Sequence, residues 1–210
     1  MKVFTIVIGL LNQRAQKALE TWPTPVQIYT RIDCLKVSRN FSFATKAFAS
    51  MHKNPVIQSD MCRLMLLCQF GGMYIDTDVS FRAPFENTID KAELFVVRDS
   101  LSELLAGTYV IGVSRPNQPC VCNAAKRAAK NVYALKGKLD FKTRPHLVHE
   151  VAGPFLFTKY VKDCVSPPYF DPSLNVYHAQ ASAAWANDKS YFSWTLERMK
   201  QAGWSTMFEH

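Results

Sequence analysis

The stretch from Asp60 to Asp78 constrains this chain more than any other, because it joins an apolar helix to a double glycine and two closely spaced aspartates. Apolar side chains after Asp60 cover nearly the whole circumference of a helix, which indicates burial on most sides. Gly71 and Gly72 follow, and glycine commonly ends a helix in a left-handed conformation. We therefore expect a buried helix, a glycine turn and a strand that ends in Asp76 and Asp78.

The two aspartates predict a metal site. Side chains alternate between the two faces of a strand, so Tyr74, Asp76 and Asp78 are expected on one face. Carboxylates this close repel each other unless a cation or a proton lies between them. Their hard oxygens suit Mg²⁺ or Mn²⁺, which keep positions open for the phosphate oxygens of a substrate.

Arg63 lies among apolar residues of the helix, which we expect Ser59 to cap. A guanidinium in such surroundings needs a partner, because burying an unpaired charge costs several kcal/mol. Asp60 lies one turn earlier, so an ion pair within the helix is one interpretation. In the other, both side chains face a ligand, with Arg63 as a donor and Asp60 as an acceptor.

A longer motif includes both aspartates and reads Ser59-Asp60-x-x-Arg63, then Leu66-Leu67, then Gly71-Gly72-x-Tyr74-x-Asp76-x-Asp78. This string resembles the sugar-binding region of the DXD glycosyltransferases of GT-A fold. A bare Asp-x-Asp carries little information, but the whole string spans a helix, a turn and a strand. The chain is also similar to the N-terminal domain of a chlorovirus capsid-glycan glycosyltransferase, which would make it a viral protein.

The resemblance implies a role for each matched residue. Asp60 and Arg63 would contact the donor sugar and its phosphate, and Tyr74 would pack beside the sugar nucleotide. Asp76 would hold the ribose or the metal, and Asp78 would bind the metal directly. The implied catalytic residues are Asp76, Asp78 and Arg63, with Mn²⁺ or Mg²⁺ as the cofactor.

Weaker similarity extends downstream. Gly153 lies in a Gly-Pro segment that resembles one near the donor and acceptor sugars of the family. His178 matches a late histidine, and we expect it to be the third metal ligand. Ser182 and Trp185 resemble a Ser-Trp pair that closes over the diphosphate, although here two alanines separate them.

The activity implied is transfer of a sugar from a nucleoside diphosphate sugar, UDP before GDP, to a glycan or glycoprotein acceptor. The family favours retention of configuration. An inverting enzyme would need a carboxylate base, for which Glu150 and Asp188 are both candidates. The alternatives are a sugar-nucleotide or glycan binding module without turnover and a nucleotidyltransferase, whose glycine turn lies farther ahead of its aspartates.

Strand-like and helix-like runs alternate along the chain, which predicts an α/β fold with a mostly parallel sheet flanked by helices. Strands are expected over 3–9, 26–32, 93–98 and 108–113, the last two near the sheet centre, and helices over 12–22, 41–52 and 122–135. The family resemblance makes this a Rossmann-like GT-A domain. We expect a single domain over residues 1–210, within a longer protein if the chain is a fragment.

The amino-acid composition limits the classes of partner and the cellular compartment that we expect for this chain. The formal net charge is +8, which favours anionic ligands, but the basic and aromatic residues form no recognisable nucleic-acid module, so no nucleic-acid partner is expected. The six cysteines lack a Cys-x-x-Cys pair and lie among apolar residues, which indicates reduced thiols. No apolar run approaches the roughly 20 residues of a membrane span. A cytoplasmic location is expected, in the host cytoplasm if the protein is viral.

Overall fold

The computed structural model describes residues 1–84, 92–99, 104–135, 147–166, 169–172 and 175–178. The chain divides into two units, Met1–Tyr177 and His178–His210. All but one of the described residues belong to the first unit; from the second, only His178 is described. The expectation of one domain over residues 1–210 stays a prediction. Within the described part of the chain, no helix is long and apolar enough to cross a membrane.

A five-stranded sheet forms the centre of the first unit, in the order β2-β1-β3-β6-β5. Its strands are β1 (Val3–Val7), β2 (Gln27–Thr30), β3 (Gly72–Ile75), β5 (Leu94–Arg98) and β6 (Ala106–Val113). β1 pairs in parallel with β2 and β3, whereas β6 is antiparallel to β3 and β5. Four strands therefore run one way, which confirms the mostly parallel α/β sheet. The expected central position of β5 is wrong, because the antiparallel hairpin with β6 leaves β5 at the edge.

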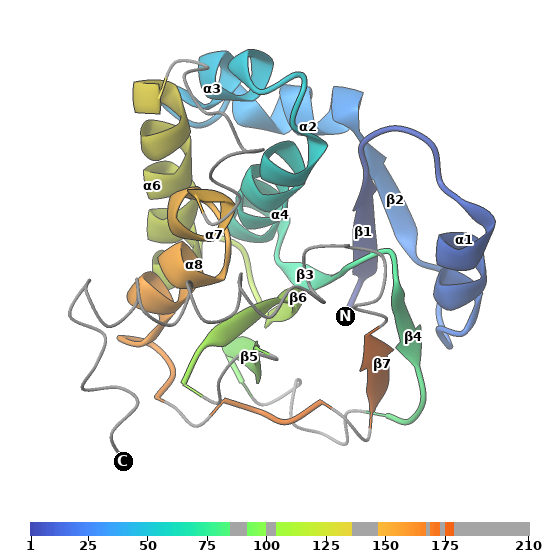
Figure 1. Ribbon diagram of the computed structural model, residues 1–210. Helices are drawn as coiled ribbons and strands as arrows, with labels where there is room; N and C mark the ends of the chain where they lie inside the picture. Colours follow the sequence, from blue (N-terminus) through green and yellow to red (C-terminus); the bar gives the residue numbers. More distant parts are fainter. Residues whose placement is uncertain (85–91, 100–103, 136–146, 167–168, 173–174, 179–210) are drawn as a thin grey trace, which may run out of the picture. The chain divides into compact units, whose positions relative to one another are not determined.

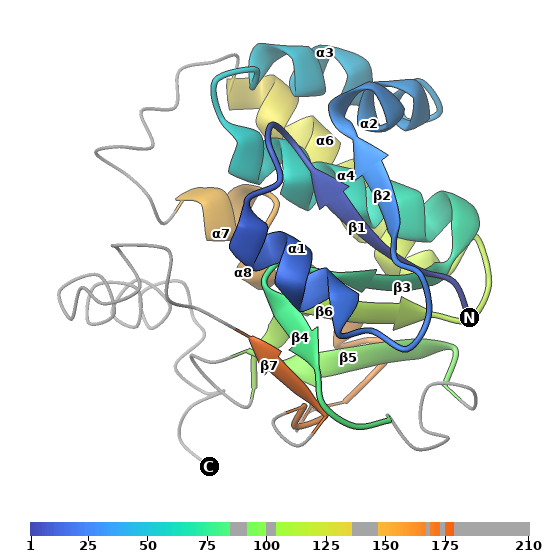
Figure 2. The same ribbon diagram turned by 90° about the vertical axis from the view of Figure 1, so that its right-hand side faces the viewer.

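Helices cover both faces of this sheet (Figures 1 and 2). They are α1 (Gln13–Glu20), α2 (Arg31–Ser38), α3 (Ala44–Ser50), α4 (Pro55–Phe70), α6 (Pro119–Leu135), α7 (Leu147–Val151) and α8 (Pro154–Val161). The larger core cluster packs α2, α3, α4, α6 and α8 against one face. The smaller cluster lies on the other face and includes Leu19 and Trp22. Alternate side chains of β3 pack into the two clusters. Tyr74 belongs to the larger cluster on the α4 side, and Met73 and Ile75 belong to the smaller cluster on the other face.

Helix α4 carries much of the candidate site and begins earlier than expected. Its N-cap is Asn54, whose side chain accepts a hydrogen bond from the Ile57 amide, and Pro55 occupies the first turn. The prediction that Ser59 caps the helix is therefore wrong, because the Asn-Pro pair starts it one turn sooner. The expected end is confirmed, since α4 stops at Phe70 and Gly71 has a φ angle of 65°.

Strand β3 ends at Ile75, so Asp76 and Asp78 lie in the turn before β4 (Val79–Phe81) and not on the strand itself. The expected alternation of strand side chains therefore does not extend to Asp78. Backbone hydrogen bonds explain the early end: the Asp76 amide donates to the Tyr109 carbonyl at 2.8 Å, and the Val79 amide donates to the Asp76 carbonyl at 3.1 Å, which closes the turn.

Helix α2 is absent from the expected elements, because residues 26–32 have the composition of a strand. In the structure β2 ends at Thr30 and α2 starts at the next residue. The side chains of Thr30 and Asp33 form a capping box at this junction. No glycine or proline separates β2 from α2 in the sequence. The transition from strand to helix at Thr30 was therefore not predicted.

The prediction of reduced thiols is wrong, because all six cysteines form disulfides. The pairs are Cys34–Cys62, Cys68–Cys122 and Cys120–Cys164. Their Cα–Cα distances of 5.4, 4.9 and 6.5 Å lie in the range that a disulfide spans. The partners are 28, 54 and 44 residues apart in sequence. The packing of α2, α4 and α6 brings the first two pairs together, whereas Cys164 follows α8. Apolar neighbours in sequence were therefore a poor guide to the redox state of the cysteines.

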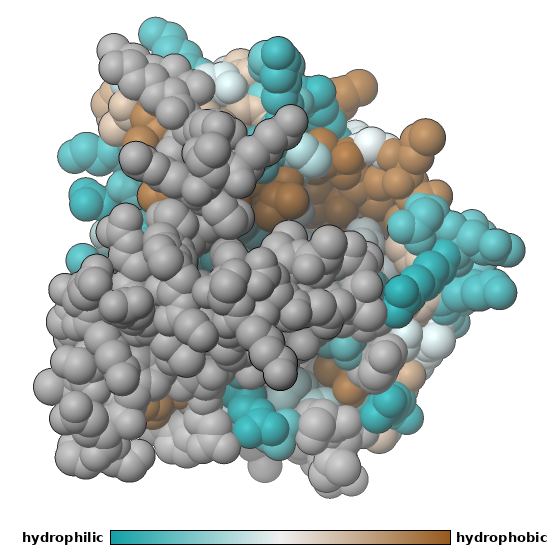
Figure 3. Space-filling model, viewed as in Figure 1, coloured by the Kyte–Doolittle hydropathy of each residue, from teal (hydrophilic) through white to brown (hydrophobic). Residues whose placement is uncertain are grey.

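Apolar side chains reach the surface near the upper ends of β1 and β2 in the view of Figure 3. Leu10, three residues after β1, is 99% exposed, and Ile32 near the start of α2 is 66% exposed. The carboxyl end of β1 therefore lies beside exposed apolar side chains.

Candidate active site

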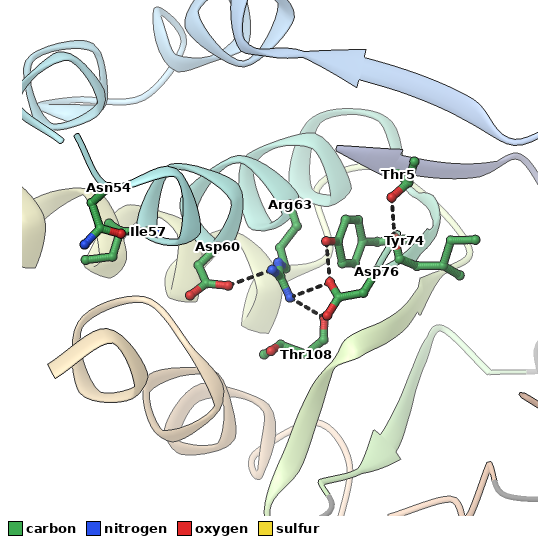
Figure 4. A network of polar contacts seen from close by, with 9 residues as sticks. Thr5, Asn54, Ile57, Asp60, Arg63, Tyr74, Asp76 and Thr108 are labelled. Carbon is green, nitrogen blue, oxygen red and sulfur yellow. Dashed lines mark hydrogen bonds and ion pairs between the residues drawn. The ribbon is translucent and has the colours of Figure 1, made fainter. Parts of the chain in front are cut away.

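Arg63 is the centre of a polar network beside the Asp76–Asp78 turn (Figure 4). Its Nη2 lies 2.7 Å from Oδ1 of Asp60, one turn earlier on α4. Its Nη1 lies 3.2 Å from Oδ1 of Asp76 and donates to the Thr108 carbonyl at 2.7 Å. One side chain thus ties α4 to the turn after β3 and to the backbone of β6.

This network is buried and strongly charged. Asp60 is 5% exposed and Arg63 is 6% exposed. Burial raises the pKa of Asp60 to about 6; the positive charge of Arg63 opposes this rise and the negative charge of Asp76 adds to it. Burial works to lower the pKa of Arg63, but the surrounding acidic groups, Asp76 foremost, outweigh it and raise the pKa. The ion pair within the helix therefore forms, and Arg63 reaches the DXD turn as well.

Tyr74 joins the network from β3. Its hydroxyl donates to Oδ1 of Asp76 at 2.5 Å, and its ring centroid lies 4.6 Å from the guanidinium carbon of Arg63. The ring is 1% exposed and makes an edge contact with Phe4. Burial raises the pKa of Tyr74 well above its ordinary value, and the positive charge of Arg63 opposes the rise. Tyr74 thus contacts the site from within the core.

Backbone groups of neighbouring strands fix the turn. The Tyr109 carbonyl of β6 accepts the amide of Asp76, next to the Thr108 carbonyl that accepts Arg63. On the other side, the buried Thr5 hydroxyl of β1 donates to the Ile75 carbonyl at 2.7 Å. Sequence reasoning missed these contacts, because a main-chain carbonyl leaves no trace in the type of residue that carries it.

Two aspartates and a histidine come together as a candidate metal site. One ligand atom from each of Asp76, Asp78 and His178 lies within 4.8 Å of the other two, and all three residues are half-buried. His178 is the last residue of β7 (Val176–His178), which pairs with β4 directly after the turn. Two carboxylates and an imidazole form a donor set that suits Mn²⁺, and Mg²⁺ through the carboxylates. This group can hold a divalent metal ion.

The remaining candidates are placed as follows. Gly153 is the N-cap of α8 and is buried. A Cβ there would lie 2.9 Å from the Cα atom of His149, so close packing of α7 on α8 is reason enough for a glycine. Glu150, on α7, is exposed. Ser182, Trp185 and Asp188 lie outside the described residues.

Comparisons with known proteins agree with this picture. Residues 9–95 match the family described as "Glycosyltransferase sugar-binding region containing DXD motif", a range that includes the network and both aspartates of the turn. Among solved structures, the fold is similar to a chain described as "PaToxG Glycosyltransferase", with a TM-score of 0.57 and 16% identity, over 78% of this chain and 68% of the other. This likeness concerns the fold alone. No curated protein matches. The DXD region of this chain is thus similar to that family, and its fold is similar to that of a glycosyltransferase chain.

Proposed function

We propose that this chain is a metal-dependent glycosyltransferase of GT-A type, which moves a sugar from a nucleoside diphosphate sugar to a glycan or glycoprotein acceptor. The observation that carries the proposal is the grouping of Asp76, Asp78 and His178 within 4.8 Å, inside a fold shared with a glycosyltransferase. UDP is the proposed carrier before GDP, and retention the proposed outcome. Both finer assignments follow the family resemblance.

Asp78, Asp76 and His178 would hold Mn²⁺ or Mg²⁺, and the ion would stabilise the negative charge that develops on the departing diphosphate. Neighbouring residues hold the proposed metal ligand Asp76 and its turn in position. Tyr74 and Arg63 hold the carboxylate of Asp76, while the carbonyls of Thr108 and Tyr109 hold Arg63 and the turn. Such preorganisation matters, because donors already in place need no rearrangement when charge develops.

Asp60 and Arg63 are the proposed contacts for the donor sugar. Both are buried and already paired, so a sugar hydroxyl would meet a fixed acceptor and a fixed donor. Gly153, Ser182 and Trp185 remain proposed substrate contacts on the strength of the family resemblance. No catalytic base is proposed, because retention can rely on the leaving phosphate.

The disulfides bear on the cellular compartment of the protein. The expected cytoplasmic location depended on reduced thiols, and three disulfides remove that support, since disulfides persist in oxidising compartments. The absence of a nucleic-acid partner stays an expectation drawn from the dispersed basic residues.

The decisive experiment incubates the protein with a panel of UDP and GDP sugars, Mn²⁺ and glycan acceptors, and follows transfer and donor hydrolysis by mass spectrometry. Transfer or metal-dependent hydrolysis of one donor supports the enzyme. Tight donor binding without either reaction would support a sugar-nucleotide binding module instead. Release of pyrophosphate from a nucleoside triphosphate and a sugar phosphate would identify a nucleotidyltransferase.

A further inference from the structure

The hydroxyl of Tyr74 is the part of that side chain that packing does not explain. The ring fills the space between Phe4 and Arg63, and a phenylalanine would fill the same space. The hydroxyl instead reaches Oδ1 of Asp76, the first aspartate of the DXD motif, at 2.5 Å. A buried hydroxyl is retained where its hydrogen bond has a use, because leaving it unpaired is costly.

Hydrogen-bond directions follow from the groups involved. An ionised carboxylate only accepts, so the single proton of the Tyr74 hydroxyl points to Asp76. Tyr74 is therefore the donor and Asp76 the acceptor of this hydrogen bond.

The same carboxylate oxygen meets a second donor. Nη1 of Arg63 lies 3.2 Å from Oδ1 of Asp76, and the guanidinium rests on the face of the Tyr74 ring. The two donors come from different elements, β3 and α4. Two donors that approach one oxygen from separate rigid elements restrict rotation of the carboxylate.

We infer that Tyr74 is a positioning residue, whose hydroxyl orients the Asp76 carboxylate for the metal site. This inference rests on the proposed function, because it assigns Tyr74 to that same metal site. It differs from the role implied by the family resemblance, in which the Tyr74 ring packs beside the sugar nucleotide. Partners that orient a metal ligand commonly change metal affinity by about 10- to 100-fold.

The test compares Tyr74→Phe with Tyr29→Phe, using Mn²⁺ alone as the probe in calorimetric titrations of the full chain. Tyr29 packs on the same Phe4 ring with a centroid distance of 5.4 Å, so its variant is a matched loss of a hydroxyl. We expect Tyr74→Phe to bind Mn²⁺ at least about tenfold more weakly than wild type. Tyr29→Phe should bind as wild type does. Thermal melting of both variants checks that the fold is kept.

Each outcome separates this inference from the function on which it rests. If wild type binds Mn²⁺ and Tyr74→Phe binds it equally well, the positioning role is overturned and the metal site stands. If wild type binds no Mn²⁺, both ideas fail. Should Tyr74→Phe not fold, Tyr74→Met, which also lacks a donor, takes its place: at least about tenfold weaker Mn²⁺ binding supports the positioning role, and unchanged affinity overturns it.

Discussion

Nη1 of Arg63 lies 3.2 Å from Oδ1 of Asp76, so an ion pair between a buried arginine and a half-buried aspartate links a helix to the DXD turn. The two residues are 13 positions apart in sequence and belong to different elements. Asp60 binds the other end of the same guanidinium at 2.7 Å. The candidate site is therefore an extension of the core, and changes to it should affect stability and ligand binding to different degrees at different residues.

Arg63→Ala should destabilise the protein strongly. The substitution leaves the buried carboxylate of Asp60 without its cation and removes packing on Tyr74, so we expect a loss of about 3–5 kcal/mol in the free energy of unfolding. Urea denaturation at pH 7 measures it. Arg115→Ala is the matched control, because it breaks an exposed ion pair with Glu93 and should cost less than about 1 kcal/mol. Equal losses in the two variants would contradict the central place of Arg63.

Asp78→Ala should leave stability nearly unchanged and abolish metal binding. Asp78 lies half-buried in a turn, so its removal creates no cavity in the core, but it takes one of three ligands from the candidate metal site. Mn²⁺ titration and thermal melting, run on the same preparation, measure the two effects. His178→Ala should weaken Mn²⁺ binding in the same way, whereas the exposed Asp163→Ala should change neither property. Normal Mn²⁺ affinity in Asp78→Ala would remove this aspartate from the site.

Stability should depend on pH through Asp60, whose pKa burial raises to about 6. The folded protein then holds this proton more tightly than the unfolded chain, whose Asp pKa is about 3.9. The stabilising contribution is complete below about pH 4 and is lost as the pH rises through about 6. Asp60→Asn stays neutral, so the stability of wild type relative to this variant should fall by about 3 kcal/mol between pH 4 and 7.

Urea denaturation of wild type and Asp60→Asn at several pH values measures this difference directly. Groups that titrate elsewhere affect both proteins equally and cancel. The exposed Asp163→Asn serves as the control and should show no such trend. A difference between wild type and Asp60→Asn that is constant, or that grows in favour of wild type with rising pH, would show that burial does not control this carboxyl group.

The three disulfides should differ in their resistance to reduction. Cys34 and Cys62 are fully buried, whereas Cys164 is exposed, and a thiolate must reach a sulfur atom to break the bond. Under mild dithiothreitol in native buffer, Cys120–Cys164 should be reduced first and Cys34–Cys62 last. Alkylation of the new thiols followed by mass spectrometry records the order. Simultaneous reduction of all three pairs would indicate that reduction follows global unfolding.

The sequence allowed prediction of the parts of the site that depend on local chemistry. The apolar surroundings of Arg63 required a partner, and its partner is Asp60. The glycine pair ended the helix at the expected residue, and Asp76 and Asp78 lie in one group that could hold a metal ion. These features depend on neighbours within about 20 residues along the chain.

Features set by distant segments escaped prediction. The carbonyls of Thr108 and Tyr109 enter the site because β6 pairs antiparallel with β3, a register that no local pattern encodes. The disulfide Cys34–Cys62 depends on α2, a helix that was absent from the expected elements. Ser59 lies inside α4 instead of at its cap, because Asn54 and Pro55 start the helix earlier. Tertiary packing decided the first two cases, whereas the start of α4 at Asn54 and Pro55 is a local signal that the prediction overlooked.

The most direct test of the central claim is calorimetric titration of UDP and GDP into the protein, with Mn²⁺ present and with Mn²⁺ removed by a chelator. A diphosphate that approaches the carboxylates of Asp76 and Asp78 is repelled unless a divalent cation lies between them. We predict binding of at least one of the two nucleotides with Mn²⁺ and a loss of at least about tenfold in affinity without it. Equal affinity in both conditions would contradict the claim that these residues hold a metal ion for a nucleoside diphosphate.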